Sequence, residues 1–355
     1  MSMRPRATIH LGNIVDNWRL FDHTARPGKV GAVLKCDAYG HGAAPVSKAL
    51  YEAGCRTFFV AYPEEGADLR AALGPNADIF VFQGAVSGHA TLVKTKSLTP
   101  VLNSLKEIRA WMDLGQGDPF ALHVDTGMNR LGVSLGQLSN VRDALGDKRP
   151  KLIMSHMASA DTPPARQNRA QLEAFKAAKA FFPGVPTSLE NTAAHWLDDS
   201  FRSDLSRPGI GLYGGGTSPL RADTLKPGLT LEARILQISE VPADQNVGYG
   251  ATATLSRDSV LATIGLGYGD GFPRSASNSG FVYLGQMHCP VVGRVSMDLI
   301  TVDVTAVKGL AKVGGLVEVI GTNADLEAQA AAAGTLGYEL LTGLSARVER
   351  IYQHD

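Results

Sequence analysis

The stretch Val30-Gly-Ala-Val-Leu-Lys35 is an uncharged apolar run that ends in a lysine, and it is the first of eight comparable runs. Amphipathic segments such as Ala44–Glu52 and Gln167–Phe182 separate these runs. Such alternation predicts parallel strands joined by helical crossovers. Eight units in this length favour an α/β fold of the (β/α)8 TIM-barrel type over a doubly wound open sheet. The runs cover residues 30–35, 57–62, 78–83, 97–102, 120–125, 151–156, 187–191 and 203–213.

The sequence changes character after about Pro227. Short apolar runs are now separated by Gly, Asp, Asn and Pro, which is typical of a smaller, mainly β domain. We therefore predict a barrel domain over residues 10–226 and a mainly β domain over 227–355, with which residues 1–9 could pack. The expected strands of the second domain are 260–264, 281–284, 290–295, 300–304, 317–320 and a last one near 347–352, with a helix around 325–333.

Composition narrows the class of partner. Of the 355 residues, 44% are hydrophobic, which is usual for a globular protein. A chain of this length is too long to fold around a single core. Basic and acidic residues number 34 each, so charge gives no reason to expect a nucleic-acid or membrane partner. No stretch is long enough to cross a bilayer. The three cysteines show no disulfide or metal-site spacing, so we expect a cytoplasmic protein without a bound metal. The balanced charge leaves a small molecule as the expected substrate.

The active site of a (β/α)8 barrel lies at the carboxyl ends of its strands, so the polar residues at these ends are the candidates. They would converge on one face, and this convergence is more informative than any single residue. The candidates are Lys35, Tyr39, His123, Arg130, His156, Asn191, Thr192, Arg207, Gly209 and Ile210.

Lys35 follows a run without charge, and partial desolvation there would lower the pKa of its amine. A neutral amine is what a lysine needs to form a Schiff base with an aldehyde cofactor. The alternative is a strand-end lysine whose stem lies along the apolar surface. Near Gly209, backbone N–H groups could bind a phosphate, although a simple tight turn has the same sequence.

The other candidates each have an ordinary structural interpretation. His156 lies in an apolar run and would usually be a core histidine, while Asp125 is best interpreted as a cap of the following turn. In the second domain, Tyr249 and Tyr268 stand among glycines, which leaves their hydroxyl groups accessible or simply marks turns. Ser296-Met297-Asp298 is either a strand-end turn or part of a binding surface.

Five blocks of this sequence, in the same order, resemble those of the alanine racemases. The resemblance extends from Arg6 to Tyr352, and several independent motifs make it specific. The blocks are Val33-Leu-Lys-Cys-Asp-Ala-Tyr-Gly-His-Gly42, Asp125-Thr-Gly-Met-Asn-Arg-Leu-Gly132, Arg207-Pro-Gly-Ile-Gly-Leu-Tyr-Gly214, Tyr249-Gly-Ala-Thr252 and Val292-Gly-Arg-Val-Ser-Met-Asp298.

The resemblance implies pyridoxal 5'-phosphate bound to Lys35 in a barrel followed by a β domain. It places Arg207 at the pyridine nitrogen, with His156 linked to it and Asn191 nearby. The residues implied for the cofactor phosphate are Tyr39, Thr192, the backbone of Gly209 and Ile210, and Tyr352. The family more often has serine where Thr192 stands, and the hydroxyl group is retained.

The resemblance also implies racemisation of alanine, which supplies D-alanine for peptidoglycan. A proton must leave one face of the α-carbon and arrive on the other, so two bases are required. By resemblance these are Lys35 and Tyr249 of the other subunit of a homodimer with shared active sites. The implied substrate-binding residues are Arg130, the backbone of Met297, Tyr268 at the entrance, and Asp298.

One position departs from the family pattern. His123 stands where many members have a lysine that becomes carbamylated and orients the arginine equivalent to Arg130. A neutral histidine cannot supply that negative charge, so we expect an anion, a water molecule or another hydrogen-bond partner to hold Arg130. The alternatives to alanine racemisation are a serine, lysine or broad-specificity racemase, a related barrel decarboxylase, a cofactor-free Schiff-base aldolase and a non-catalytic cofactor-binding protein.

Overall fold

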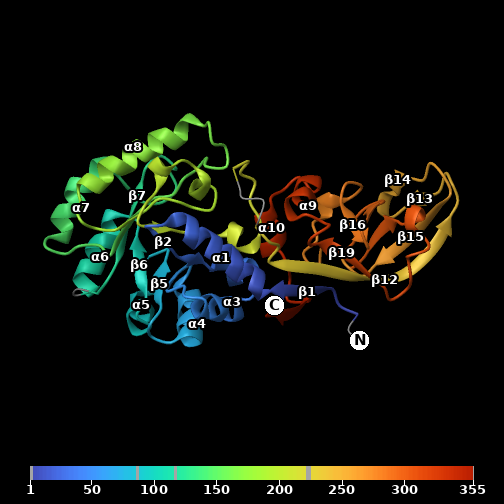
Figure 1. Cartoon of the computed structure of the whole chain (residues 1–355), viewed down its shortest axis with the longest axis horizontal. Helices are drawn as coiled ribbons and strands as arrows, with labels where there is room; N and C mark the ends of the chain where they lie inside the picture. Colours follow the sequence, from blue (N-terminus) through green and yellow to red (C-terminus); the bar gives the residue numbers. More distant parts are fainter. Residues whose placement is uncertain (1–2, 85–87, 116–117, 221–224, 355) are drawn as a thin grey trace. The chain divides into compact units, whose positions relative to one another are not determined.

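The computed structural model describes residues 3–84, 88–115, 118–220 and 225–354 of the chain. The chain divides into two compact units, and the helix α1 (Leu11–Ala25) carries it from one to the other (Figure 1). One unit is continuous and spans Ile14–Lys226, and we call it the barrel domain. The other combines Met1–Asn13 with Pro227–Asp355, and we call it the β domain.

Short parallel strands form the barrel. Seven are paired in the order β10-β9-β7-β6-β5-β4-β3, and β11 pairs with β2. The ring closes through backbone hydrogen bonds, from Arg207 N to Glu190 O (3.0 Å) and from Gly31 N to Ser206 O (3.0 Å). The strands are β2 (Lys29–Val30), β3 (Ala32–Val33), β4 (Thr57–Val60), β5 (Asp78–Val81), β6 (Thr99–Leu102), β7 (Ala121–Asp125), β9 (Leu152–Met154), β10 (Thr187–Ser188) and β11 (Leu205–Ser206), with the short β8 (Val133–Ser134) beside β7. The predicted (β/α)8 architecture is confirmed.

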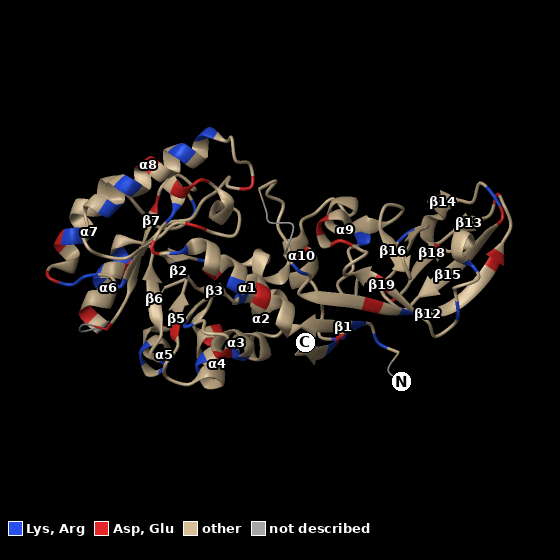
Figure 2. Cartoon of the chain, viewed as in Figure 1, with Lys and Arg blue, Asp and Glu red and all other residues tan. Residues whose placement is uncertain are grey.

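Helices follow the strands and cover the outside of the barrel (Figure 1). On α8, Leu172 and Phe175 are buried while the basic residues face outward (Figure 2). The helices are α3 (Ala43–Glu52), α4 (Pro63–Leu73), α5 (Ala90–Thr95), α6 (Leu105–Gly115), α7 (Leu138–Leu145) and α8 (Arg166–Ala180). This arrangement leaves the strand ends and their loops as the place for polar chemistry.

The β domain is built on β12 (Leu229–Val241), a long strand that alternates buried and half-buried residues over its first half. Its first half pairs with β1 (Arg6–His10) and β19 (Leu316–Ile320), and its second half, beyond a bulge near Ile235, pairs with β15 (Ser259–Ile264). The remaining elements are β13 (Asn246–Val247), β14 (Ala253–Thr254), β16 (Phe281–Leu284), β17 (Met287–Pro290), β18 (Ile300–Asp303), β20 (Glu349–Gln353), α9 (Leu326–Ala332) and α10 (Gly337–Thr342).

Several predicted strands are longer than the observed ones, and for two of them the sequence shows the reason. Over residues 203–213 only Leu205–Ser206 is a strand, because Pro208 lacks an N–H for a strand ladder and Ile210–Tyr213 form a 3-10 helix. Over residues 290–295, the strand β17 ends at Pro290, and Gly293 has a φ of +83° that is incompatible with a strand. Among the residues described, no helix is long and apolar enough to span a membrane.

Candidate active site

The segment after β3 that begins with Lys35 is a left-handed turn. Cys36, Asp37, Ala38 and Tyr39 have φ values of +52° to +54°, a region that L-residues other than glycine rarely adopt. Tertiary hydrogen bonds hold this conformation, since Cys36 N donates to Glu65 Oε1 (2.7 Å) and Ala43 N donates to Asp37 Oδ1 (2.7 Å). The turn leaves Lys35 half-buried and returns Tyr39 into the barrel, where it is 5% exposed.

Tyr39, Thr192 and Gly209 meet at the carboxyl ends of the strands. A Cβ atom on Gly209 would lie 2.4 Å from the Tyr39 hydroxyl oxygen, so the backbone and the phenol approach as closely as glycine allows. Thr192 Oγ1 accepts hydrogen bonds from Gly209 N (2.9 Å) and Gly211 N (3.2 Å). We call these residues and Ile210, the first residue of the 3-10 helix, the hydroxyl–amide cradle. Two hydroxyl groups and clustered backbone amides form a donor set that fits a phosphate group.

Arg207 is buried beside this cradle with 3% exposure. Its guanidinium donates to the Ser188 hydroxyl and to Ser155 O (2.6 Å). Burial lowers the pKa of Arg207 to about 10, against a raising influence of Glu190. Arg207 therefore stays charged at neutral pH, and it is a fixed, positively charged donor in the barrel.

His156 and Asn191 differ in their interactions within the barrel. Burial, with the charge of Arg207 next, lowers the pKa of His156 well below its usual value. Within the described residues its ring makes no hydrogen bond to Arg207. Asn191 has a structural role, because its amide donates to Met157 O (3.1 Å) and its Oδ1 accepts from Ala194 N (2.9 Å).

His123 lies at the end of β7 and is almost fully buried. Its Nδ1 lies 2.8 Å from Asn103 Oδ1, and the Asn103 amide donates to Phe82 O and Val101 O. Asn103 thus offers an acceptor, and His123 carries its proton on Nδ1. Burial, and then Arg207, lower the pKa of His123 to about 4, so the ring is neutral. Arg130 is exposed, and no hydrogen bond or ion pair joins it to any residue that the structure describes.

Asp125 is the cap that the sequence analysis favoured. Its Oδ1 accepts from Gly127 N (2.9 Å), Met128 N (3.0 Å) and Asn129 N (3.1 Å). These bonds hold the loop that leads to Arg130. The Asp125 carboxylate therefore has a structural role.

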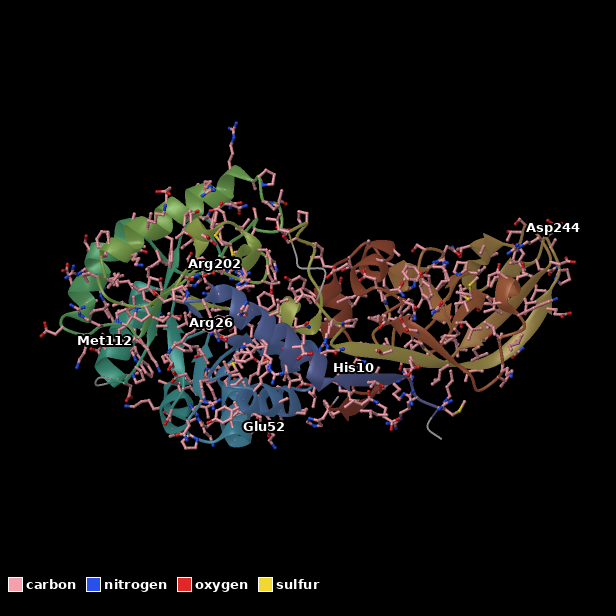
Figure 3. The ribbon with its side chains drawn as sticks, viewed as in Figure 1. His10, Arg26, Glu52, Met112, Arg202 and Asp244 are labelled. Carbon is pink, nitrogen blue, oxygen red and sulfur yellow. The ribbon has the colours of Figure 1, made fainter. Side chains whose placement is uncertain are left out.

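Tyr249 lies in the β domain at the tip of the hairpin β13–β14. The turn before β13 contains Asp244, which is labelled in Figure 3. The Tyr249 side chain is 72% exposed, the most exposed large hydrophobic side chain among the described residues. Glycines at 248 and 250, with φ values of +74° and +73°, form the tip. The hairpin therefore presents a phenol to the surroundings of the domain.

Tyr268, Met297 and Asp298 lie on two neighbouring loops of the β domain. Tyr268 N donates to Ser296 O (3.0 Å), and the Tyr268 and Met297 side chains are 43% and 54% exposed. Asp298 is ion-paired with Arg347 (2.7 Å). Tyr352 stands separately on β20, in parallel register with Ile9 of β1.

The structure brings one group of predicted residues together in each domain, and in the β domain this group is Tyr268, Met297 and Asp298 on their two neighbouring loops. Lys35, Tyr39, Thr192, Arg207 and Gly209 share one end of the barrel. Two residues near these sets were missed. Asn103 directly follows the run 97–102, so the strand-end rule that found His123 could have found it. No local sequence pattern indicates a role for Arg347, because its partners Asp298 and Asp270 are 49 and 77 residues away in the sequence.

Comparison with known proteins gives one answer over the whole chain. Residues 9–217 match the N-terminal domain of alanine racemases, and residues 228–352 match the C-terminal domain. The alanine racemase of Cereibacter sphaeroides is 43% identical over 346 residues, covering 97% of each chain. A protein of Agrobacterium fabrum described as "Alanine racemase, catabolic" is 42% identical over 353 residues, covering 97% of this chain and 91% of the relative.

A solved structure agrees in fold and in sequence. The crystal structure of alanine racemase from Bartonella henselae, described with covalently bound pyridoxal phosphate, has a TM-score of 0.94 and 37% identity. The match covers 99% of this chain and 100% of that one. On these matches, the chain belongs to the alanine racemase family.

Proposed function

We propose that this chain interconverts L-alanine and D-alanine with pyridoxal 5'-phosphate held covalently by Lys35. The observation that carries the proposal is the hydroxyl–amide cradle at the barrel end that also holds Lys35. Tyr39 and Thr192 supply hydroxyl groups and Gly209 and Ile210 supply the backbone for a phosphate. When bound, the cofactor withdraws electrons from the α-carbon and makes its proton acidic.

Arg207 sets the strength of this electron withdrawal in the proposal. It would face the ring nitrogen, and with a pKa lowered only to about 10 it keeps its own proton at neutral pH. A protonated arginine cannot accept a proton and donates only a hydrogen bond, so the ring nitrogen stays unprotonated. A weaker electron sink favours return of the proton to the α-carbon over side reactions, which suits racemisation.

Two groups would move the proton on opposite faces. Lys35 Nζ serves one face, and the Tyr249 hydroxyl, from the other subunit of a homodimer, serves the second. The exposure of Tyr249 at the hairpin tip supports its supply to another chain. Arg130 and the Met297 backbone would hold the substrate carboxylate, and Tyr268 would line the entrance. Tyr352 would complete the phosphate site.

The test is an assay of purified protein against a panel of L- and D-amino acids, with visible absorbance recorded before and after borohydride. We expect a yellow protein whose colour is lost on reduction, racemisation of alanine, and neither property in Lys35→Ala. A colourless protein would contradict the cofactor proposal. Equal or faster racemisation of serine or lysine would make the enzyme a broader-specificity racemase.

We propose that the enzyme works in the cytoplasm and supplies D-alanine for peptidoglycan. Its three cysteines are unpaired, which fits a reducing compartment. Expression in a bacterium that requires D-alanine should restore growth without supplement. If growth is restored only poorly while growth on alanine as carbon source depends on the gene, the role is catabolic.

A further inference from the structure

We infer that Arg347 is a positioning residue that clamps together the two loops carrying Tyr268 and Met297. The first loop, which we call the tyrosine loop, spans residues 265–271. The second, the methionine loop, spans 296–299. The inference deepens the proposed function, because both loops are there assigned to the substrate. It also gives Asp298 a role as an anchor of the clamp.

The Arg347 guanidinium bridges one carboxylate from each loop. Its Nη2 lies 2.7 Å from Asp298 Oδ1 in the methionine loop, and its Nε lies 3.2 Å from Asp270 Oδ1 in the tyrosine loop. The Asp270 side chain is 2% exposed, whereas that of Asp298 is 54% exposed. One end of the clamp is therefore buried in the domain and the other reaches the surface.

Backbone hydrogen bonds hold the two loops in contact along the clamp. Tyr268 N donates to Ser296 O (3.0 Å), and Gly269 N donates to Met297 O (2.8 Å). A Cβ atom on Gly267 would lie 2.4 Å from Met297 O, so the loops touch without room for a side chain. The positions of Tyr268 and of the Met297 backbone are consequently set by each other.

Asp270 also ties the tyrosine loop to itself and to the segment before Arg347. Its Oδ2 accepts from Gly267 N (3.0 Å), and its backbone oxygen accepts from Ser345 N (3.1 Å). Gly271 has a φ of +106°, and a Cβ there would lie 2.2 Å from Gly343 O. Three chain segments thus meet at the Asp270–Arg347 pair.

The chemistry of arginine suits this junction. Its planar fork can address two carboxylates in fixed directions, whereas a lysine ammonium is a single point charge. Burial raises the pKa of the Asp270 carboxyl, and the Gly267 N–H and the charge of Arg347 counteract this effect. The Arg347 Nη1 also lies against Gly269, 2.7 Å from where a Cβ atom would be, so a larger residue at position 269 would displace the guanidinium.

The test compares Arg347→Ala and Arg347→Lys with Arg257→Ala in the intact holoenzyme. Arg257 makes an ion pair of similar length, 3.2 Å to Asp303, in the same domain, and its partner lies at the far end of β18 and not in either loop, so it is a matched control. The first readout is amide hydrogen exchange of peptides covering 265–271 and 296–299. The second is the separate effect on KM and kcat for alanine.

We expect Arg347→Ala to speed exchange in both loops by about tenfold or more, while the control leaves them unchanged. We expect KM to rise about tenfold with a smaller change in kcat, and Arg347→Lys to lie between. Should Arg347→Ala fail to fold, Asp298→Asn cuts the exposed end alone, keeps Asp270 paired, and should still speed exchange in the methionine loop.

Unchanged exchange in both loops would overturn the clamp. Faster exchange with unchanged KM would keep the clamp and remove Tyr268 and Met297 from substrate binding, which separates failure of this inference from failure of the proposed function.

Discussion

His123 shows how a single buried side chain can make the barrel sensitive to acid. Its pKa is lowered from 6.5 to about 4 in the folded protein. Between these two values the unfolded chain binds a proton that the folded chain does not, so stability is present above pH 6.5 and is lost as pH falls towards 4. The depression corresponds to about 3 kcal/mol between pH 7 and pH 4.

Replacement of His123 by Gln should therefore flatten the loss of barrel stability in this range of pH. All three tryptophans of the chain (Trp18, Trp111 and Trp196) lie in the barrel domain, so their fluorescence during urea unfolding follows this domain alone. An equally steep loss of unfolding free energy from pH 7 to pH 4 in the variant would mean that other groups, such as His195, dominate.

Thr192 offers a second prediction for a single residue. Thr192→Val removes the acceptor of the Gly209 and Gly211 N–H groups together with one hydroxyl group of the cradle. A hydrogen bond to a charged group contributes about 1.5–3 kcal/mol, so loss of the Thr192 hydroxyl as a donor to the phosphate should weaken binding of pyridoxal phosphate by at least about tenfold. Equilibrium dialysis measures this affinity. Thr192→Ser should retain it, and equal binding by Val would show that the hydroxyl group has no part in the site.

Among the elements, the left-handed turn depends on Asp37. This residue tolerates a φ of +52° better than most, and its carboxylate caps the first turn of α3 through Ala43 N. We expect Asp37→Ala to destabilise the barrel by about 1–2 kcal/mol. Tryptophan-monitored urea unfolding checks this value, and Asp37→Asn, which keeps both properties, is the control. Equal stability of the Ala variant would show that tertiary contacts alone maintain the turn.

Elements with a regular pattern could be predicted from the sequence, and irregular ones could not. The run 57–62 and the segment Pro63–Leu73 contain the observed β4 and α4, because periodicity and turn residues agree there. The long strand β12 was missed although Leu229–Val241 alternates apolar and polar residues. The left-handed turn gave no local signal, since Cys36 and Ala38 adopt it only under tertiary hydrogen bonds.

For the molecule as a whole, the proposed sharing of active sites between subunits predicts complementation. Lys35→Ala and Tyr249→Phe chains are each expected to be almost inactive. Mixed after subunit exchange, they should form heterodimers with one intact site and recover activity. Mass spectrometry should establish that heterodimers have formed. Heterodimers without activity would reject a shared site, and the single mutants alone serve as controls.

The candidate site was predictable from the sequence where one rule covered all of its members. Barrel topology sends every strand end to one face, so Lys35, Thr192 and Arg207 could be grouped before the structure was known. The Arg347 clamp could not, because nothing local links an arginine to carboxylates in two distant loops. Resemblance to a family identifies the sequence blocks that match its motifs. It does not show which other side chains hold these blocks in place.

The pairing of β1 has a consequence for the order in which the protein is made. Ala7 lies opposite Leu231 on one side and Arg350 on the other, so β1 leaves the ribosome before both of its partner strands and waits for them to be made. The barrel domain is continuous in sequence and can fold during translation. The β domain combines residues that precede and follow the barrel domain in the sequence, and its sheet can be completed only once residues 349–353 have been made.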